Sequence, residues 1–587
     1  MEIASREVGI VQGESSVGYF EFVVNPETRL KFGDFVVAKN QDGEYVLAVV
    51  RRVESSNLLL SEGHFTYRSL KRELELYEGV RNVDLNIARA RVLGKIVTRR
   101  GRVVTPLPSN RIPIMNGETV YQASKELLES LYASGEGVKI GELLTREDGV
   151  EVTLDVDKLV SRHFAVLAVT GAGKSNTVSV IADEIVNRFG GTIIILDPHS
   201  EYITLRFPNG EKANVIAGKI RPEVLAADEL ATLVGIAENA KNQRDFFRRA
   251  YDTVTSPDTS LKARYNLSGV LGGELFLKAI LHVLHEWEEN GGGEYYDPIS
   301  NTSKVFELRS EDKDPLAKVM RRIQSFLRDY GDILTSEDFL TNPDNGEGKV
   351  RFGDFNVIDL GGLDDDQMTV VANHLIKKTY ETRVTYEKAK KRLEFLNGVM
   401  AKSPSELYRK EREEVKKLIE NIETNYPALT EPVLIIIEEA HIFAPAEGRS
   451  EIAQLLGKIA REGRKFGIGL GIVSQRPKKL DPEVLSQANT KIILRLVEPE
   501  DQNHVRKASE QLSSDLLEDI ASLGIGEAVV VGMSIALPAL VRIDDFQKRG
   551  GRYGGKDIEI AKRWRKKREA LKRKERKSKA IAGDLPL

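Results

Sequence analysis

The segment Ala168-Val169-Thr170-Gly171-Ala172-Gly173-Lys174-Ser175 has the residue types and spacing of a phosphate-binding loop. Nucleotide phosphates carry several negative charges, and small residues allow backbone N–H groups to curl around them. A lysine at the position of Lys174 reaches the β- and γ-phosphate oxygens, and the hydroxyl of Ser175 can bind Mg²⁺. The segment predicts a nucleotide site formed by Thr170, Gly171, Ala172, Gly173, Lys174, Ser175 and Asn176.

The residues on either side predict the strand–loop–helix arrangement that this site needs. Phe164–Val169 is a short apolar run typical of a strand, and apolar residues recur at helical spacing after Ser175. A helix that begins at the loop points its N-terminus at the phosphates. The alternative, a glycine-rich turn before an ordinary helix, is disfavoured by these flanks.

A second apolar run, Val433–Ile437, ends in two acids, Glu438 and Glu439. Beside a phosphate loop, Glu438 would hold Mg²⁺ through water, and Glu439 would orient and deprotonate the attacking water. The first of these acids is more often Asp, so Glu438 is a departure. An apolar strand ending in two acids is common by itself; behind the loop, the pair indicates nucleotide hydrolysis.

Asp197 and Gln475 end two other predicted strands. Ligands of parallel α/β sheets bind at the carboxyl ends of strands, so Asp197 could touch Mg²⁺ or the catalytic water. Its alternative role is to cap the Asp-Pro turn. Gln475 could sense the γ-phosphate or bond the backbone before Pro477. Glu201 is a weaker candidate than either.

Arg461 and Arg464 precede the strand Ile468–Val473. The transition state of phosphoryl transfer calls for an arginine, which a neighbouring subunit often supplies. The alternative is that both arginines are solvated at the end of a surface helix.

The pattern of apolar runs changes along the chain and predicts an α/β P-loop NTPase core with a mainly parallel sheet. Strands are expected at Ile193–Leu196, Val350–Leu360, Val433–Ile437, Ile468–Val473 and Ile492–Leu496, with an edge hairpin at Ala528–Val531 and Leu540–Ile543. The expected divisions are a small β-barrel at 1–105, a linker at 106–150, the core at 151–545 with a helical insertion at about 220–345, and a basic helical tail at 546–587.

Composition excludes several classes of protein. The 587 residues include no Cys, which excludes disulfides and Cys-based metal sites. No uncharged apolar run is long enough to span a membrane, and the N-terminus does not resemble a signal peptide, so a cytoplasmic location is expected. The net charge is −3, yet Lys548 to Lys579 holds 16 Lys and Arg against 4 Asp and Glu, a local +12.

The ordered set of motifs resembles the HerA branch of the HerA/FtsK family of ring-forming DNA translocases. The resemblance covers most of the chain. It rests on the N-terminal barrel, Arg162-His163-Phe164 before Thr-Gly-Ala-Gly-Lys-Ser-Asn-Thr, Leu-Asp-Pro-His-Ser-Glu-Tyr, Ile-Ile-Glu-Glu-Ala-His, Glu-Gly-Arg-Lys-Phe-Gly, and Ser-Gln-Arg-Pro followed by Asn489-Thr490-Lys491.

This resemblance implies a RecA-like core, ATP and Mg²⁺ as ligands, and a homohexamer that threads double-stranded DNA through a central channel. It implies a NurA-type nuclease as partner, with which the family resects DNA ends for recombinational repair in archaea, and it makes the HAS-barrel-like N-terminal domain the docking face. Mre11–Rad50-type repair proteins are further possible partners. The in-trans arginine finger of the family falls on Arg464, with Arg461 as alternative, and a second phosphate-contacting arginine falls on Arg162.

Other interpretations stay open. Arg449, Lys478 and Lys479 are candidates to grip DNA electrostatically, but each could be an ordinary solvated charge. The basic tail could contact DNA or a neighbouring subunit. The protein could also be a conjugation-type pump at a membrane, or a nucleotide-gated scaffold that regulates a nuclease.

Overall fold

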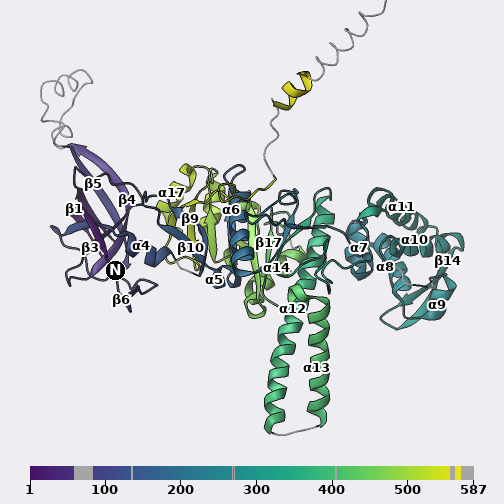
Figure 1. Ribbon diagram of the computed structural model, residues 1–587. Helices are drawn as coiled ribbons and strands as arrows, with labels where there is room; N and C mark the ends of the chain where they lie inside the picture. Colours follow the sequence, from purple (N-terminus) through teal and green to yellow (C-terminus); the bar gives the residue numbers. More distant parts are fainter. Residues whose placement is uncertain are drawn as a thin grey trace, which may run out of the picture.

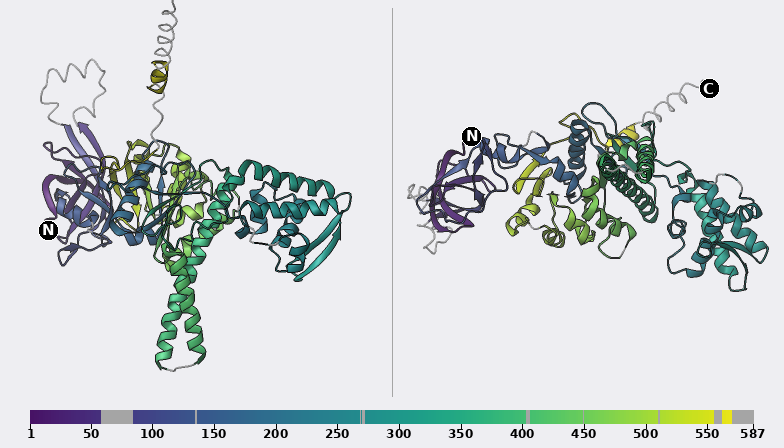
Figure 2. Two further views of the ribbon diagram at one scale, coloured as in Figure 1. Left: turned by 45° about the vertical axis from the view of Figure 1, so that its right-hand side comes forward. Right: turned by 90° about the horizontal axis from the view of Figure 1, so that it is seen from below.

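The computed structural model describes residues 1–57, 84–133, 136–267, 269, 272–402, 406–448, 450–509, 511–554 and 562–569. A β-barrel lies at one end, the α/β core lies in the middle, and a mainly helical unit lies at the other end (Figure 1). A long pair of helices stands out from the core in Figure 1 and in the left view of Figure 2.

Six strands close the N-terminal barrel in the order β1-β2-β5-β4-β3-β8. They are β1 (Ala4–Ser15), β2 (Tyr19–Val24), β3 (Phe35–Lys39), β4 (Tyr45–Asn57), β5 (Asp84–Lys95) and β8 (Thr119–Ala123); a small hairpin of β6 (Thr98–Arg99) and β7 (Arg102–Val103) lies between β5 and β8. Alternate residues of β2, such as Phe20 and Phe22, fill the interior.

The prediction of a linker at 106–150 is wrong. β8 lies within it and closes the barrel by pairing with both β1 and β3. The same stretch holds α4 (Lys125–Tyr132) and β9 (Gly137–Leu143), followed by β10 (Glu151–Asp155). These strands are short and lie among turn residues. The sequence pattern alone therefore does not identify them as strands, because they are stabilised by pairing with distant strands.

The core is an eleven-stranded sheet in the order β10-β9-β21-β20-β19-β11-β18-β17-β12-β16-β13. Its further strands are β11 (Phe164–Leu167), β12 (Thr192–Asp197), β13 (Asn214–Ala217), β16 (Phe355–Asp359), β17 (Val433–Ile437), β18 (Ile468–Ser474), β19 (Thr490–Ile493), β20 (Glu527–Gly532) and β21 (Ala539–Ile543). From β19 to β13 all neighbours are parallel. The expected α/β architecture with a mainly parallel sheet is confirmed.

The hairpin of β20 and β21 was expected at the edge of the sheet, and this is wrong. β20 pairs with β19, and β21 pairs with β9, which in turn pairs with β10. Residues before the phosphate loop therefore supply two additional strands, and these cover the edge that the hairpin would otherwise leave free.

The sheet is buried on both faces because alternate residues of its strands pack into two separate cores. Ala165 and Leu167 of β11 face one core, and Phe164 and Val166 face the other. The surrounding helices are α5 (Val156–Ser161), α6 (Lys174–Asp183) with its π-helical continuation (Glu184–Arg188), α14 (Glu451–Glu462), α15 (Pro482–Gln487), α16 (Pro499–Lys507) and α17 (Ser514–Ser522). Short 3₁₀ turns occur at Pro222–Val224, Gly331–Ile333, Pro427–Leu429, Gly463–Phe466 and Pro477–Lys479.

Between β13 and β17 the chain forms two excursions from the sheet (Figure 1). The first holds α7 (Ala227–Leu233), α8 (Lys241–Thr255), α9 (Thr259–Arg264), α10 (Glu274–Glu289) and α11 (Lys313–Tyr330), with a hairpin of β14 (Gly292–Asp297) and β15 (Thr302–Glu307). The second pairs α12 (Asp365–Lys402) with α13 (Glu406–Asn425) through a small apolar seam that includes Tyr386 and Ile419.

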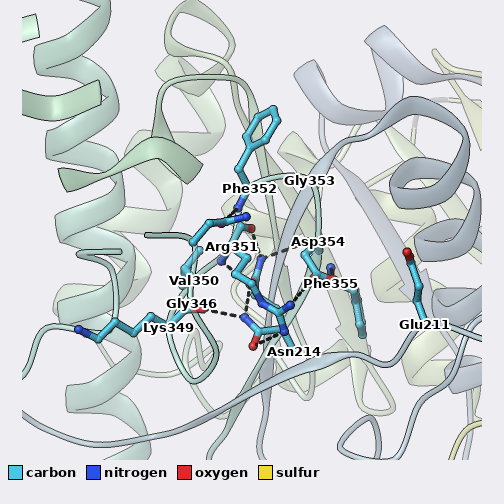
Figure 3. Close-up of polar contacts among 12 residues, drawn as sticks. Glu211, Asn214, Gly346, Lys349, Val350, Arg351, Phe352, Gly353, Asp354 and Phe355 are labelled. Atoms are coloured by element: carbon cyan, nitrogen blue, oxygen red, sulfur yellow. Dashed lines mark hydrogen bonds and ion pairs between the residues drawn. The ribbon is translucent and has the colours of Figure 1, made fainter. Parts of the chain in front are cut away.

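Buried amides fasten the outermost parallel strand, β13, to the core. Asn214 donates to Oδ1 of Asn356 at 2.7 Å, and Arg351 donates to Oδ1 of Asn214 at 2.9 Å (Figure 3). Arg351 also lies 3.4 Å from the carboxylate of Asp354. This network holds the end of the sheet where only one neighbouring strand is present.

The predicted basic tail is described only in part: residues 555–561 and 570–587 lie outside the described residues. Before this point Phe546 is fully buried, and Arg552 exchanges two backbone hydrogen bonds with Arg206. Among the described helices, none combines the length and the apolar character that a membrane crossing requires.

Candidate nucleotide-hydrolysis site

The predicted phosphate loop lies between β11 and α6, at the carboxyl end of the parallel strands. Gly171 and Gly173 have φ values of 78° and 109°, which residues other than glycine rarely adopt. Gly173 is the N-cap of α6 and provides no side-chain cap. The first N–H groups of α6 are therefore directed at the loop, where an anion would accept their hydrogen bonds.

Lys174 lies on the first turn of α6 and contacts both acids after β17. Its Nζ donates to Oε2 of Glu438 at 2.8 Å and to Oε1 of Glu439 at 2.5 Å, and all three side chains are buried. Burial opposes the charge of Lys174, but the two carboxylates outweigh it and raise the pKa of Lys174. Burial raises the pKa of Glu438. At Glu439, burial is outweighed by Lys174 and His441, which lower its pKa, so Glu439 is ionised at neutral pH.

Glu439 has a positive φ of 46°, an unusual conformation for a residue other than glycine. Its carboxylate accepts a hydrogen bond from Nε2 of Gln475 at 2.6 Å, and Gln475 also accepts a hydrogen bond from the Thr170 hydroxyl. Gln475 therefore joins the acid to the phosphate loop. The side chain of Gln475 bonds other side chains here, and its sensing of the γ-phosphate stays a prediction.

The oxygen ligands near the loop fit Mg²⁺. Ser175 donates to Glu201 at 2.5 Å, and the hydroxyl of Tyr202 donates to Glu438. Mg²⁺ prefers oxygen ligands and usually retains waters, with one or two carboxylates besides the phosphates. Among the described residues no group of three or more acids, His or Cys could hold a metal by itself.

Asp197 has a different environment from the one expected of a catalytic acid. It is buried, and its two carboxylate oxygens accept the backbone N–H groups of Glu201 at 3.0 Å and Tyr202 at 2.9 Å. This favours its alternative role as a cap. Through the cap, Asp197 positions the two side chains that contact Ser175 and Glu438. Sequence reasoning missed Tyr202, although it ends the quoted Leu-Asp-Pro-His-Ser-Glu-Tyr motif.

We expect Tyr202→Phe to raise the Mg²⁺ concentration required for half-maximal ATPase by about tenfold, because an unsupported Glu438 would hold the metal less well. Nucleotide binding without Mg²⁺ should change little. Tyr132→Phe is the matched control: Tyr132 is also fully buried but lies on α4, and its hydroxyl has no hydrogen bond among the described residues. An unchanged Mg²⁺ dependence in Tyr202→Phe would contradict this role.

The three candidate arginines lie at the other end of the strands from the loop of their own chain. Arg162 lies two residues before the start of β11, and Arg461 and Arg464 precede β18. His163 connects these segments: its Nε2 contacts the carbonyl of Ala460 at 3.0 Å, and burial lowers its pKa to about 4. Arg461 forms an ion pair with Glu483, whereas Arg464 is exposed and forms no ion pair with any described residue.

The DNA-grip candidates differ among themselves. The ammonium group of Lys478 lies 3.2 Å from Glu498 and 3.0 Å from Glu500, so its charge is neutralised within the chain. Lys479 is exposed and forms no ion pair among the described residues. Arg449 lies outside the described residues.

Three family models match consecutive parts of the chain: the HAS barrel domain at residues 8–98, the central domain of helicase HerA at 138–379, and the HerA-like helicase C-terminal domain at 417–543. The DNA double-strand break repair helicase HerA of Pyrococcus furiosus is 47% identical over 567 residues, which are 95% of this chain and 97% of that protein. The chain belongs to the HerA helicase family.

Other members of the HerA family are similar in sequence to this chain over nearly its whole length. A probable DNA double-strand break repair helicase HerA of Methanocaldococcus jannaschii is 38% identical, over 94% of this chain and 98% of the relative. The HerA of Sulfolobus acidocaldarius is 30% identical, over 96% and 97%. The solved structure of VirB4 of Thermoanaerobacter pseudethanolicus is more distant, with a TM-score of 0.44 and 15% identity over 70% of this chain and 97% of that one.

Proposed function

We propose that this HerA-family protein is an ATP-driven motor that moves along or unwinds double-stranded DNA during double-strand break repair. Its relatives are named as repair helicases, and Lys174 of the phosphate loop contacts the two candidate acids Glu438 and Glu439. The protein would act as a homohexameric ring in the cytoplasm. A NurA-type nuclease would dock on the barrel, and the two would resect DNA ends, with Mre11–Rad50-type proteins as further partners.

The observation that carries this proposal is the separation of the loop from the arginines. Lys174 and Glu439 are in contact at one end of the parallel strands, whereas Arg464 lies before β18, at the other end. Phosphoryl transfer needs a positive group beside the transferring γ-phosphate. A neighbouring copy supplies it when subunits are arranged head to tail, and such contacts close into a ring when the rotation permits.

Nucleotide binding would switch the site through Lys174. The ammonium group of Lys174 binds both Glu438 and Glu439, so incoming phosphates compete with the carboxylates for it. Glu439 would then be free to orient water, while Gln475 reports the change to Thr170 in the loop. Mg²⁺, held by Ser175 and Glu438, would neutralise the phosphate oxygens.

The deciding experiment is steady-state ATPase of the purified protein with and without linear duplex DNA, with Lys174→Ala as control. We expect severalfold stimulation by DNA that disappears in Lys174→Ala, because that variant lacks the phosphate-binding charge. Turnover that is indifferent to DNA would contradict a motor that acts alone on DNA. It would favour the nucleotide-gated scaffold, and co-fractionation with membranes would instead favour the pump.

A further inference from the structure

One arginine is fully buried at the base of the helix pair α12–α13, which stands out from the core (Figure 1). Arg383 of α12 is only 1% exposed. It lies where α12 leaves the core, because Tyr380 belongs to the main apolar core, whereas Tyr386 belongs to the seam between the two helices. Burial of a charge is costly unless the group is paired and hydrogen-bonded, so the partners of Arg383 show what this position requires.

The guanidinium group of Arg383 joins three segments. Its Nη2 donates to Glu387 of the same helix at 2.8 Å, and this carboxylate offsets the buried charge. Its Nη1 donates to the carbonyl of Leu429 at 3.0 Å, in the turn after α13, and its Nε donates to the carbonyl of Phe466 at 2.8 Å. The rigid fork of an arginine can bind such separate acceptors at once. Arg383 therefore fastens both the start and the return of the helix pair to the turn at Phe466.

This turn carries Arg464, the candidate arginine finger. It is the 3₁₀ turn Gly463–Phe466, and it ends at Gly467, which has a φ of 67°. A Cβ at Gly467 would lie 2.7 Å from Nη2 of Arg383, so the glycine allows the guanidinium group to approach the turn. The side chain of Arg464 is exposed, whereas the backbone of its turn is held by a buried group.

A second residue of α12 contacts the same region. The hydroxyl of Tyr380 donates at 3.1 Å to Glu462, which directly precedes the turn, and its ring lies edge-on to the ring of Phe466 at 6.2 Å. Nζ of Lys458 on α14 lies 5.0 Å from the centre of the Tyr380 ring. The base of α12 thus contacts the backbone of the turn, its aromatic side chain and the residue before it.

We propose that Arg383 is a positioning residue for Arg464, and that the base of the helix pair is the support from which Arg464 reaches the phosphates of the neighbouring subunit. This inference rests on the proposed ATPase function and deepens it. A group that stabilises a transferring phosphoryl must be held to within a fraction of an ångström. Because Arg464 is exposed on a short turn, the contacts of its backbone have to provide that accuracy.

The test measures ATPase and calorimetric ATP binding of the full-length protein. Glutamine can donate to one of the two carbonyls but cannot hold both turns, so we expect Arg383→Gln to lower kcat about tenfold to hundredfold. ATP affinity should stay within about twofold, because the phosphate loop is untouched. Arg244→Gln is the matched control: Arg244 also donates to two backbone carbonyls, those of Ala237 and Ile236, but lies in the helical insertion, so kcat should not change.

A double variant separates positioning from a general structural role. If Arg383 acts through Arg464, then adding Arg383→Gln to Arg464→Ala should lower single-turnover hydrolysis by less than about twofold beyond Arg464→Ala alone. A structural defect would instead multiply the two losses. Multiplied losses, an unchanged kcat in Arg383→Gln, or normal turnover in Arg464→Ala would each overturn the proposal.

A milder variant keeps the test valid if Arg383→Gln does not fold. Tyr380→Phe keeps the ring and loses only the hydrogen bond to Glu462, so kcat should fall about twofold to fivefold, and this loss should disappear when Arg464→Ala is also present. Wild-type kcat in Tyr380→Phe would then overturn the proposal. Failure of the ATPase assignment itself is recognised separately, because the wild type would then hydrolyse ATP no faster than Lys174→Ala.

Discussion

Glu439→Gln is expected to bind ATP nearly as well as the wild type but to hydrolyse it about 10²–10⁴-fold more slowly. Glutamine keeps the size and the hydrogen-bonding capacity of the side chain but cannot accept a proton from water. Lys174 holds the pKa of Glu439 below its usual value, so the wild-type group is ionised and available as an acceptor. Calorimetric ATP binding and single-turnover hydrolysis measure the two effects separately.

Glu423→Gln is the matched control for this change. Glu423 accepts a hydrogen bond from Tyr386 in the helix pair α12–α13, away from the loop, and its replacement should leave hydrolysis unchanged. Turnover of Glu439→Gln within about threefold of the wild type would remove Glu439 from the water-activating role. A loss of ATP binding as large as the loss of hydrolysis would show that Glu439 acts mainly by positioning Lys174.

The central part of the fold could be predicted because its signals are local. The strand Val433–Ile437 is a continuous apolar run, and the structure gives it the same bounds. The phosphate loop needs small residues and a lysine at fixed spacing, which the sequence states directly. Strands buried on both faces and anion-binding loops have distinctive local sequences. Each of these elements could therefore be predicted without knowing its neighbours.

The rest depends on contacts between distant residues. β8 becomes a barrel strand only because β1 and β3 leave a gap for it, and β9 joins the core sheet by pairing with β21, almost 400 residues later. The ion pairs of Lys478 with Glu498 and Glu500 depend on the position of α16 in the fold, which the sequence alone does not show.

Side-chain roles near the loop show the same limit. Asp197 was interpreted as a possible metal or water ligand, because it ends a strand. The structure shows that Asp197 binds the backbone of the turn, and that Tyr202 is the residue that contacts Glu438. A tyrosine five residues beyond a strand carries no signal of its own, since its direction depends on how the turn is capped.

Arg464→Ala is expected to reduce ATPase about 10³-fold or more while ATP binding is retained, because the positive group opposite the transferring phosphate is lost. The loop of the same chain lies at the other end of the strands, so the defect should appear in a neighbouring subunit. Arg461→Ala is the matched control from the same helix end. Arg461 is already paired with Glu483, so its removal should have a much smaller effect.

Mixing Arg464→Ala with Lys174→Ala tests whether the arginine acts between subunits. Neither variant alone has a complete site, but an interface with the loop of the first and Arg464 of the second is complete. With random mixing at equal amounts, about one quarter of the interfaces are restored, so ATPase should rise well above both parents. If both variants assemble and the mixture stays inactive, Arg464 is not the finger. In that case Arg162, which His163 ties to the same end of α14, becomes the next residue to exchange.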